Sequence, residues 1–171
     1  HKSMAQRLAK SRRRRPPRRE GKATESPRLE EDPAPRGQQV TWGKQLTGRE
    51  ASAESILALV AAEGHRFEAR NLATAAHRVG KIAGRRVRGD RRLEALADAC
   101  VARIDAFTSQ HLANAAWGFA KTGATDERLF HALAREASRQ IDTFTAQGMA
   151  NTVWAFATAR VPADTLFDAV A

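Results

Sequence analysis

Apolar residues recur at helical spacing along the second half of the chain. Leu112, Ala116 and Phe119 lie three or four residues apart, and so do Leu129 and Leu133. Because an α-helix completes one turn in 3.6 residues, residues with this spacing share one face of a helix. No window alternates apolar and polar residues between turn signals, as a β-strand would. The pattern predicts an all-α fold.

Two of the predicted helices repeat one sequence. Phe107 opens the run FTSQHLANAAWGFA, and Phe144 opens the run FTAQGMANTVWAFA 37 residues later. A more diverged copy opens at Phe67, 40 residues before the second copy. An apolar residue also lies eleven residues before each opening Phe, which predicts a preceding helix in every copy. These residues are Ile56, Leu96 and Leu133.

The repeating unit is therefore a pair of helices, and a pair of this length cannot bury its apolar faces alone. Such units stack into solenoids. We expect an α-solenoid of stacked antiparallel helical pairs over residues 51–171, with the first helices of the repeats near 67–83, 107–123 and 144–160. The helix that opens after Val161 stops early, so we also expect a domain truncated at its C-terminus, with further repeats beyond it.

Polar residues and one glycine mark the predicted helix ends. Thr108 and Thr145 follow the opening Phe and are suited to cap the N-termini of the first helices. Gly123 can end such a helix in the left-handed conformation. Thr125 or Asp126 is then expected to cap the following helix.

Residues 1–50 differ from the rest of the chain in charge and composition. They carry fourteen Lys or Arg against six acidic residues, whereas residues 51–171 carry fifteen against thirteen. Arg12–Arg15, Arg18 and Arg19 lie here among prolines and few apolar side chains, which predicts a disordered or extended basic tail. Such a tail neutralises phosphates and binds RNA or DNA without sequence choice. The alternative is a solubilising or targeting tail.

Residue types used in catalysis or metal binding follow no recognised pattern. The five His are scattered, without the Cys or carboxylate spacing of a metal site. Gly80 and Lys81 are followed by Ile82 rather than Ser or Thr, so they are not a phosphate-binding loop. Cys100 lies among small apolar residues and is expected to be a buried hydrophobe in a reducing compartment. We expect no enzyme activity, cofactor, metal, small-molecule substrate or membrane span.

The repeated motif, Phe-Thr-x-Gln-x-Leu/Met-Ala-Asn-x-x-Trp-x-Phe-Ala, resembles the octotricopeptide repeats of organellar RNA-binding proteins. It is also similar to the helical repeats found beside RAP domains. The match is specific over residues 107–123 and 144–160 and loose over 51–171. The first copy departs from it, with Thr74 for the Asn and His77 for the Trp. The resemblance implies an α-solenoid acting in organellar RNA maturation, stability or translation, in some lineages within the organellar ribosome.

Aligning the copies places polar residues in three columns on one helix face. The columns are Arg70, Gln110 and Gln147; Thr74, Asn114 and Asn151; and Lys81, Lys121 and Thr158. Amides can pair with base edges in unstacked RNA, and lysines can meet its backbone. The alternative is that Asn114 and Asn151 cap or bridge neighbouring helices, because a buried amide must be hydrogen-bonded.

Trp117 and Trp154 form a further column on the flank of that face. They can stack on bases, or they can fill the space between successive repeats. Cations at the end of the predicted helix 67–83 and in the turn that follows it form the strongest basic patch of the helical part. The alternative is that they form a solvated loop. The members of the patch are Arg78, Lys81, Arg85, Arg86, Arg88, Arg91 and Arg92.

Together with these observations, the resemblance implies an RNA-binding helical-repeat protein of organellar RNA metabolism or translation, located in mitochondria or, alternatively, chloroplasts. A place in an organellar ribosome fits this class, with RNA and neighbouring proteins of a ribonucleoprotein as partners. The alternative is a protein-binding scaffold of which only the basic tail touches RNA. The residues expected to contact RNA are Arg12, Arg13, Arg14, Arg15, Arg18, Arg19, Arg70, Lys81, Arg85, Arg86, Arg88, Gln110, Asn114, Lys121, Gln147 and Asn151.

Overall fold

The computed structural model describes residues 32–162, 164 and 166. Arg12–Arg15, Arg18 and Arg19, predicted to bind RNA, lie outside the described residues. Within the described part, seven α-helices are joined by loops and short 3-10 turns, so the predicted all-α class is confirmed. The helices are α1 (Arg36–Thr47), α2 (Ala53–Glu63), α3 (Ala69–Ala83), α4 (Arg92–Ala102), α5 (Ser109–Thr122), α6 (Glu127–Arg139) and α7 (Ala146–Ala159).

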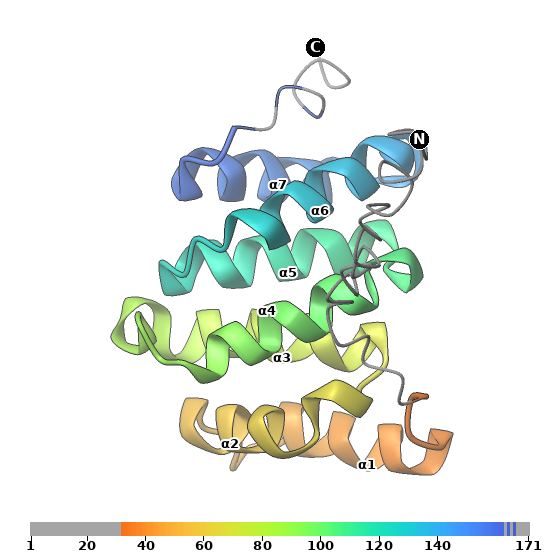
Figure 1. The fold of residues 1–171 in the computed structure, drawn as a ribbon, viewed down its shortest axis with the longest axis vertical. Helices are drawn as coiled ribbons and strands as arrows, with labels where there is room; N and C mark the ends of the chain where they lie inside the picture. Colours follow the sequence, from red (N-terminus) through yellow and green to blue (C-terminus); the bar gives the residue numbers. More distant parts are fainter. Residues whose placement is uncertain (1–31, 163, 165, 167–171) are drawn as a thin grey trace, which may run out of the picture.

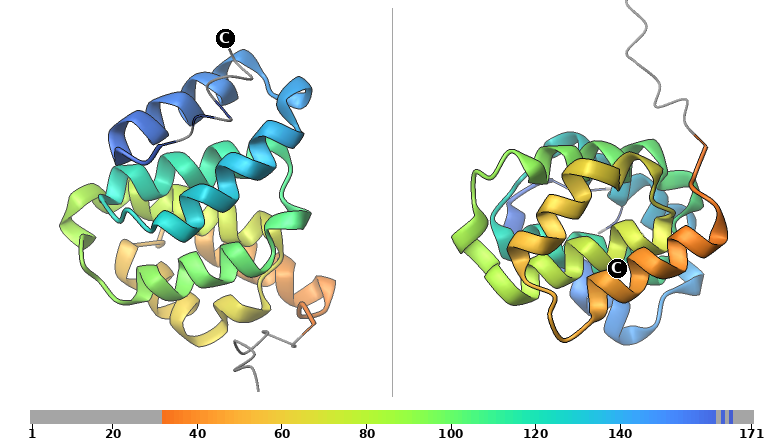
Figure 2. Two further views of the ribbon diagram at one scale, coloured as in Figure 1. Left: turned by 45° about the horizontal axis from the view of Figure 1, so that its top comes forward. Right: turned by 90° about the horizontal axis from the view of Figure 1, so that it is seen from below.

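The helices pack as pairs in two rows. Figure 1 shows the helices stacked from α1 and α2 at one end to α7 at the other, and the right-hand view of Figure 2 looks along this stack. Helices α1, α3, α5 and α7 contact one another in that order, and α2, α4 and α6 do the same in the second row. None of the helices in the described part is long and apolar enough to cross a bilayer.

The repeated motif starts α5 and α7 in the same way. The Thr108 hydroxyl accepts a hydrogen bond from the backbone N–H of His111 (3.4 Å), and the Thr145 hydroxyl accepts one from Gly148 (3.0 Å). Asp126 caps α6 through the backbone N–H of Leu129 (3.1 Å). These caps confirm the predicted helix starts, because each satisfies an N–H that has no partner within its helix.

The opening Phe of each motif anchors the helix that follows it. Phe67 and Phe107 are almost completely buried, whereas Phe144 is half-buried. Phe130 and Phe156 extend the same core, with their rings edge to face at 5.2 Å between centroids. The core therefore runs continuously from one end of the stack to the other.

The packed helices begin before the predicted boundary at residue 51. Helix α1 lies within the segment assigned to the basic tail, yet Trp42 and Leu46 are buried, and the Trp42 and Phe67 ring centroids lie 4.9 Å apart. Gln39, Trp42 and Leu46 lie three or four residues apart and therefore share one face of α1. That face packs on α3, so α1 belongs to the packed helices rather than to an unpacked tail.

A buried pair of amides fastens α1 to the turn before α3. Gln39 Nε2 donates to the carbonyls of Ala34 (3.2 Å) and Arg66 (2.7 Å). Its Oε1 accepts from the backbone N–H of Glu68 (3.0 Å) and from Asn71 Nδ2 (2.9 Å). Asn71 Nδ2 also donates to the Gln39 carbonyl (2.9 Å). The polar atoms of Gln39 thus all have partners, as burial requires.

Candidate nucleic-acid interface

Helices α3, α5 and α7 present the same four positions on one face, which we call the repeat face. Successive members of each set are four, three and four residues apart, so they form one stripe along the helix. The stripes are Arg70, Thr74, His77 and Lys81 on α3; Gln110, Asn114, Trp117 and Lys121 on α5; and Gln147, Asn151, Trp154 and Thr158 on α7. The tryptophans are members of this stripe and lie between the predicted columns.

Three rings run across the repeat face from helix to helix, and we call this row the ring ladder. The centroids of His77 and Trp117 lie 4.9 Å apart, and those of Trp117 and Trp154 lie 6.5 Å apart. His77 and Trp117 are half-buried, and Trp154 is 42% exposed. The tryptophans therefore pack between successive helices at the surface, outside the core.

Lys121 places a positive charge over two rings of the ladder. Its Nζ lies 5.5 Å from the Trp117 ring centre and 5.9 Å from the Trp154 ring centre. Lys81 holds the equivalent position on α3 and is exposed. Burial lowers the pKa of His77, and the charges of Lys81 and Arg78 lower it further. His77 therefore joins the ladder as a neutral ring at neutral pH.

The amides of the repeat face do not bridge helices within the described part of the chain. Gln147 Nε2 donates to Asn151 Oδ1 at 3.2 Å, a contact within α7. Asn114 is half-buried, and its side chain makes no hydrogen bond to any described residue. The bridging role belongs instead to Asn71, at a position outside the predicted columns. The pairing of Asn71 with Gln39 was missed because α1 was assigned to the tail.

The predicted arginine patch separates into residues with different partners. Arg92 pairs with Glu54 (2.7 Å) and Asp90 (2.8 Å), and these hydrogen bonds hold the pKa of both carboxyls below their ordinary values. Arg78 Nε donates to the carbonyl of Leu46 at 3.3 Å. Both side chains thus join neighbouring elements of the fold.

Arg86, predicted to contact RNA, has a local role in this structure. Its Nη2 donates to the carbonyl of Ile82 (2.6 Å), and its Nε donates to that of Ala83 (3.2 Å). These carbonyls lie in the last turn of α3, where backbone acceptors have no partner within the helix. Arg86 therefore closes the carboxyl end of α3.

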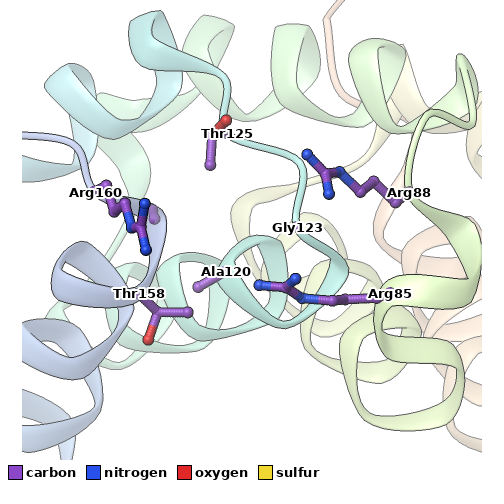
Figure 3. Close-up of a pocket in the computed structure, with 8 residues that line it drawn as sticks. Arg85, Arg88, Ala120, Gly123, Thr125, Thr158 and Arg160 are labelled. Carbon is purple, nitrogen blue, oxygen red and sulfur yellow. The ribbon is translucent and has the colours of Figure 1, made fainter.

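Arg85 and Arg88 line a groove together with Arg160, which the sequence analysis did not single out. The groove has a volume of about 400 Å³ and lies where α5 and α7 end. Figure 3 shows Arg85 and Arg88 extending into it from one side and Arg160 facing them from the other. We call this the arginine groove; its other lining residues are Ala120, Gly123, Thr125, Thr158 and Ala159.

The described residues include no candidate metal site and no exposed cysteine. Cys100 is fully buried, as predicted, and burial raises the pKa of its thiol. No group of three or more His, Cys, Asp or Glu among these residues could hold a metal ion.

Comparison with known proteins gives no match to a family model, a curated protein or a solved structure. The resemblance to octotricopeptide repeats therefore rests on the repeated motif alone.

Proposed function

We propose that this chain is an RNA-binding α-solenoid that holds single-stranded RNA along its repeat face. In this proposal the bases stack on the ring ladder, the lysines meet the phosphates, and the basic N-terminal segment adds affinity without sequence choice. The protein would act in an organellar ribonucleoprotein, mitochondrial in the first instance, as the motif's resemblance implies.

The observation that carries the proposal is the combination of rings and cations on one face. Trp154 exposes 42% of its surface, and Lys121 lies 5.9 Å from its ring centre. A base stacked on an exposed aromatic side chain contributes about 1 to 3 kcal/mol. A lysine beside the ring is then placed to meet the phosphate of the same nucleotide, which ties stacking to charge neutralisation.

The amides support the same use of the face. The Asn114 side chain has no hydrogen-bond partner among the described residues, and the Gln147–Asn151 pair lies at the surface. Amide groups in this state can exchange water for the edge of an unstacked base without disturbing the fold. The repeat of the stripe on three neighbouring helices suits an extended strand more than a compact ligand.

The test is a titration of the full chain with a labelled pool of random single-stranded RNA at physiological salt. Trp154→Ala is expected to weaken binding about 5- to 150-fold, the equivalent of about 1 to 3 kcal/mol. Val40→Ala is the matched control, because Val40 is 51% exposed and lies on α1, outside the repeat face. It should bind as the unchanged chain does.

If Trp154→Ala binds RNA as tightly as Val40→Ala, the repeat face is not the RNA site. If, in addition, replacing Arg12–Arg15 with Gln abolishes binding, RNA contact belongs to the basic segment. The scaffold alternative, in which the helices contact proteins, would then replace the proposal.

A further inference from the structure

The arginine groove holds three positive charges that have no counter-charge in the described part of the chain. The side chains of Arg85, Arg88 and Arg160 take part in no ion pair or hydrogen bond with described residues, and no carboxylate lines the groove. Asp90, two residues after Arg88, binds Arg92, and Asp164, four residues after Arg160, does not line the groove. None of the described residues that line the groove carries a negative charge to neutralise the arginines.

Helix dipoles offset only part of this charge. The carboxyl ends of α5 and α7 lie at the groove, through Ala120 and Gly123 on one side and Thr158 and Ala159 on the other. Each such end is equivalent to about half a negative elementary charge. Three arginines against two helix ends leave a net charge of about +2 in the groove.

The side chains of Arg85 and Arg88 pass close to Gly123. Gly123 ends α5 with φ 71°, and a Cβ added there would lie 3.4 Å from Arg88 Cδ and 3.7 Å from Arg85 Cγ. The stems of Arg85 and Arg88 therefore lie along this glycine, and Figure 3 shows their guanidinium groups reaching past it. A side chain at Gly123 would both strain the turn and press on the two stems.

Arg160 takes an uncommon conformation for an arginine. It ends α7 with φ 56°, and among the described residues no other non-glycine has a positive φ. Glycine or asparagine adopts this conformation with less strain. The left-handed conformation ends α7 at Arg160 and so sets the direction in which its side chain leaves the helix, toward Arg85 and Arg88 across the groove.

We infer that the arginine groove binds a phosphate group of the RNA. A terminal phosphate carries a charge between −1.5 and −2 near neutral pH, about equal and opposite to that of the groove, and arginine presents paired donors to phosphate oxygens. The inference deepens the proposed function and rests on it. Thr158 belongs to both the repeat face and the groove lining, so the groove continues the face at the ends of α5 and α7.

The experiment compares two triple variants of the full chain in RNA binding. Arg85→Gln/Arg88→Gln/Arg160→Gln removes the groove charges. The control, Arg36→Gln/Arg49→Gln/Arg135→Gln, removes three exposed arginines that lie outside the groove. Both lower the net charge equally, so a long-range effect of charge would weaken both alike. We expect at least a tenfold loss for the groove variant and less than a threefold loss for the control.

Two further probes define the ligand. The affinity of the unchanged chain is measured for RNA with a 5′-phosphate, a 3′-phosphate or neither. If one terminal phosphate raises the affinity of the unchanged chain but not that of the groove variant, the groove binds a terminal phosphate. If all three RNAs bind alike, the groove binds an internal phosphate. Inorganic phosphate should compete with RNA more strongly than chloride of equal ionic strength. Arg160→Gly relieves the backbone strain while removing the charge, so it should keep stability and still lose affinity.

The inference and the proposed function can fail separately. Equal losses in the two triple variants, or no loss in either, would overturn the groove while leaving the Trp154 result to stand alone. If Trp154→Ala has no effect and the groove variant alone loses binding, the groove stands and the ring ladder fails. If the chain binds inorganic phosphate but not RNA, the groove is a phosphate site. The inference that the bound phosphate belongs to RNA is then overturned.

Discussion

Gly118 on α5 lies directly against the backbone carbonyl of Ala76 on α3. A Cβ added to Gly118 would come closer to that carbonyl than real Cβ contacts do, and a Cβ added to Gly80 would lie 2.6 Å from the Gly118 carbonyl. Two glycines thus allow α3 and α5 to cross backbone to backbone. His77 and Trp117 are the sequence neighbours of this contact, so the crossing also brings these two rings of the ladder together.

Gly118→Ala should destabilise the chain by about 1 to 3 kcal/mol, because the added methyl group forces α3 and α5 apart in a packed region. Gly37→Ala is the control: Gly37 lies in α1 with no atom within 4 Å of an added Cβ, so the change should be neutral or stabilise by up to about 1 kcal/mol. Urea unfolding measures both values. Equal stability of the two variants would mean that the close crossing does not exist in solution.

Stability should also depend on pH through His77. Burial, together with Lys81 and Arg78, lowers the pKa of His77, so the unfolded chain takes up a proton at higher pH than the folded chain. Between about pH 6.5 and the lower pKa of the folded state, the unfolded chain binds more protons, and the free energy of unfolding falls as the pH falls. His77→Phe keeps a ring in the ladder and removes this titration.

The pH dependence of unfolding between about pH 7.5 and 5 should therefore be shallower in His77→Phe than in the unchanged chain. It should not vanish, because burial and Arg70 also lower the pKa of His111. His131→Phe serves as the control, since His131 is exposed and lies on α6, away from the ladder. An identical pH profile for His77→Phe and the unchanged chain would contradict the buried setting of His77.

The repeat made much of the helical framework predictable. The predicted segments 67–83, 107–123 and 144–160 contain α3, α5 and α7, because the opening Phe and the apolar spacing recur in each copy. The capping Thr recurs only in the copies that form α5 and α7. Local signals of this kind act within one or two turns of a helix. The same alignment also predicted which face of these helices carries the amides and cations.

The contacts between elements were not predictable in the same way. In the sequence, Arg85, Arg86, Arg88 and Arg92 form one run of positive charge. In the structure, Arg92 forms an ion pair with Glu54, and Arg86 donates to a carbonyl at the end of α3. Arg160 is distant from Arg85 and Arg88 in the sequence and lines the same groove only because of tertiary packing. Spacing along the chain does not reveal such partners, because they depend on how helix ends meet in space.

The buried amide pair gives a prediction for the start of the fold. Gln39→Ala leaves the carbonyl of Ala34 and the N–H of Glu68 without a hydrogen-bond partner among the described residues. Each unsatisfied buried group costs about 1 to 3 kcal/mol, so we expect a loss of at least about 2 kcal/mol. Gln38→Ala, on the exposed side of the same helix, should change stability by less than about 0.5 kcal/mol. If the two variants unfold at the same urea concentration, α1 does not pack as described.

The basic N-terminal segment is expected to control the salt dependence of RNA binding. Replacing Arg12–Arg15 with Gln should weaken binding to all single-stranded RNAs alike. It should lower the slope of log affinity against log salt by up to about 3, at about 0.7 per phosphate contact. Trp154→Ala should lower affinity and leave the slope unchanged, because a tryptophan displaces no counterions. An unaltered slope in the arginine variant would exclude phosphate contact by this segment.

Replacing Asn114 and Asn151 tests whether their side chains recognise RNA bases or stabilise the fold. Neither side chain bridges helices within the described residues, so Asn114→Ala/Asn151→Ala should unfold within about 0.5 kcal/mol of the unchanged chain. Asn71→Ala is the contrasting variant, since it removes two buried hydrogen bonds and should destabilise the chain by about 1 to 3 kcal/mol. Selection of RNA from a random pool by the unchanged chain and by the double variant then reports base preference. Loss of an enriched motif in the double variant, at unchanged stability, would assign base reading to the amides. The same motif in both selections would leave the face with stacking and charge alone.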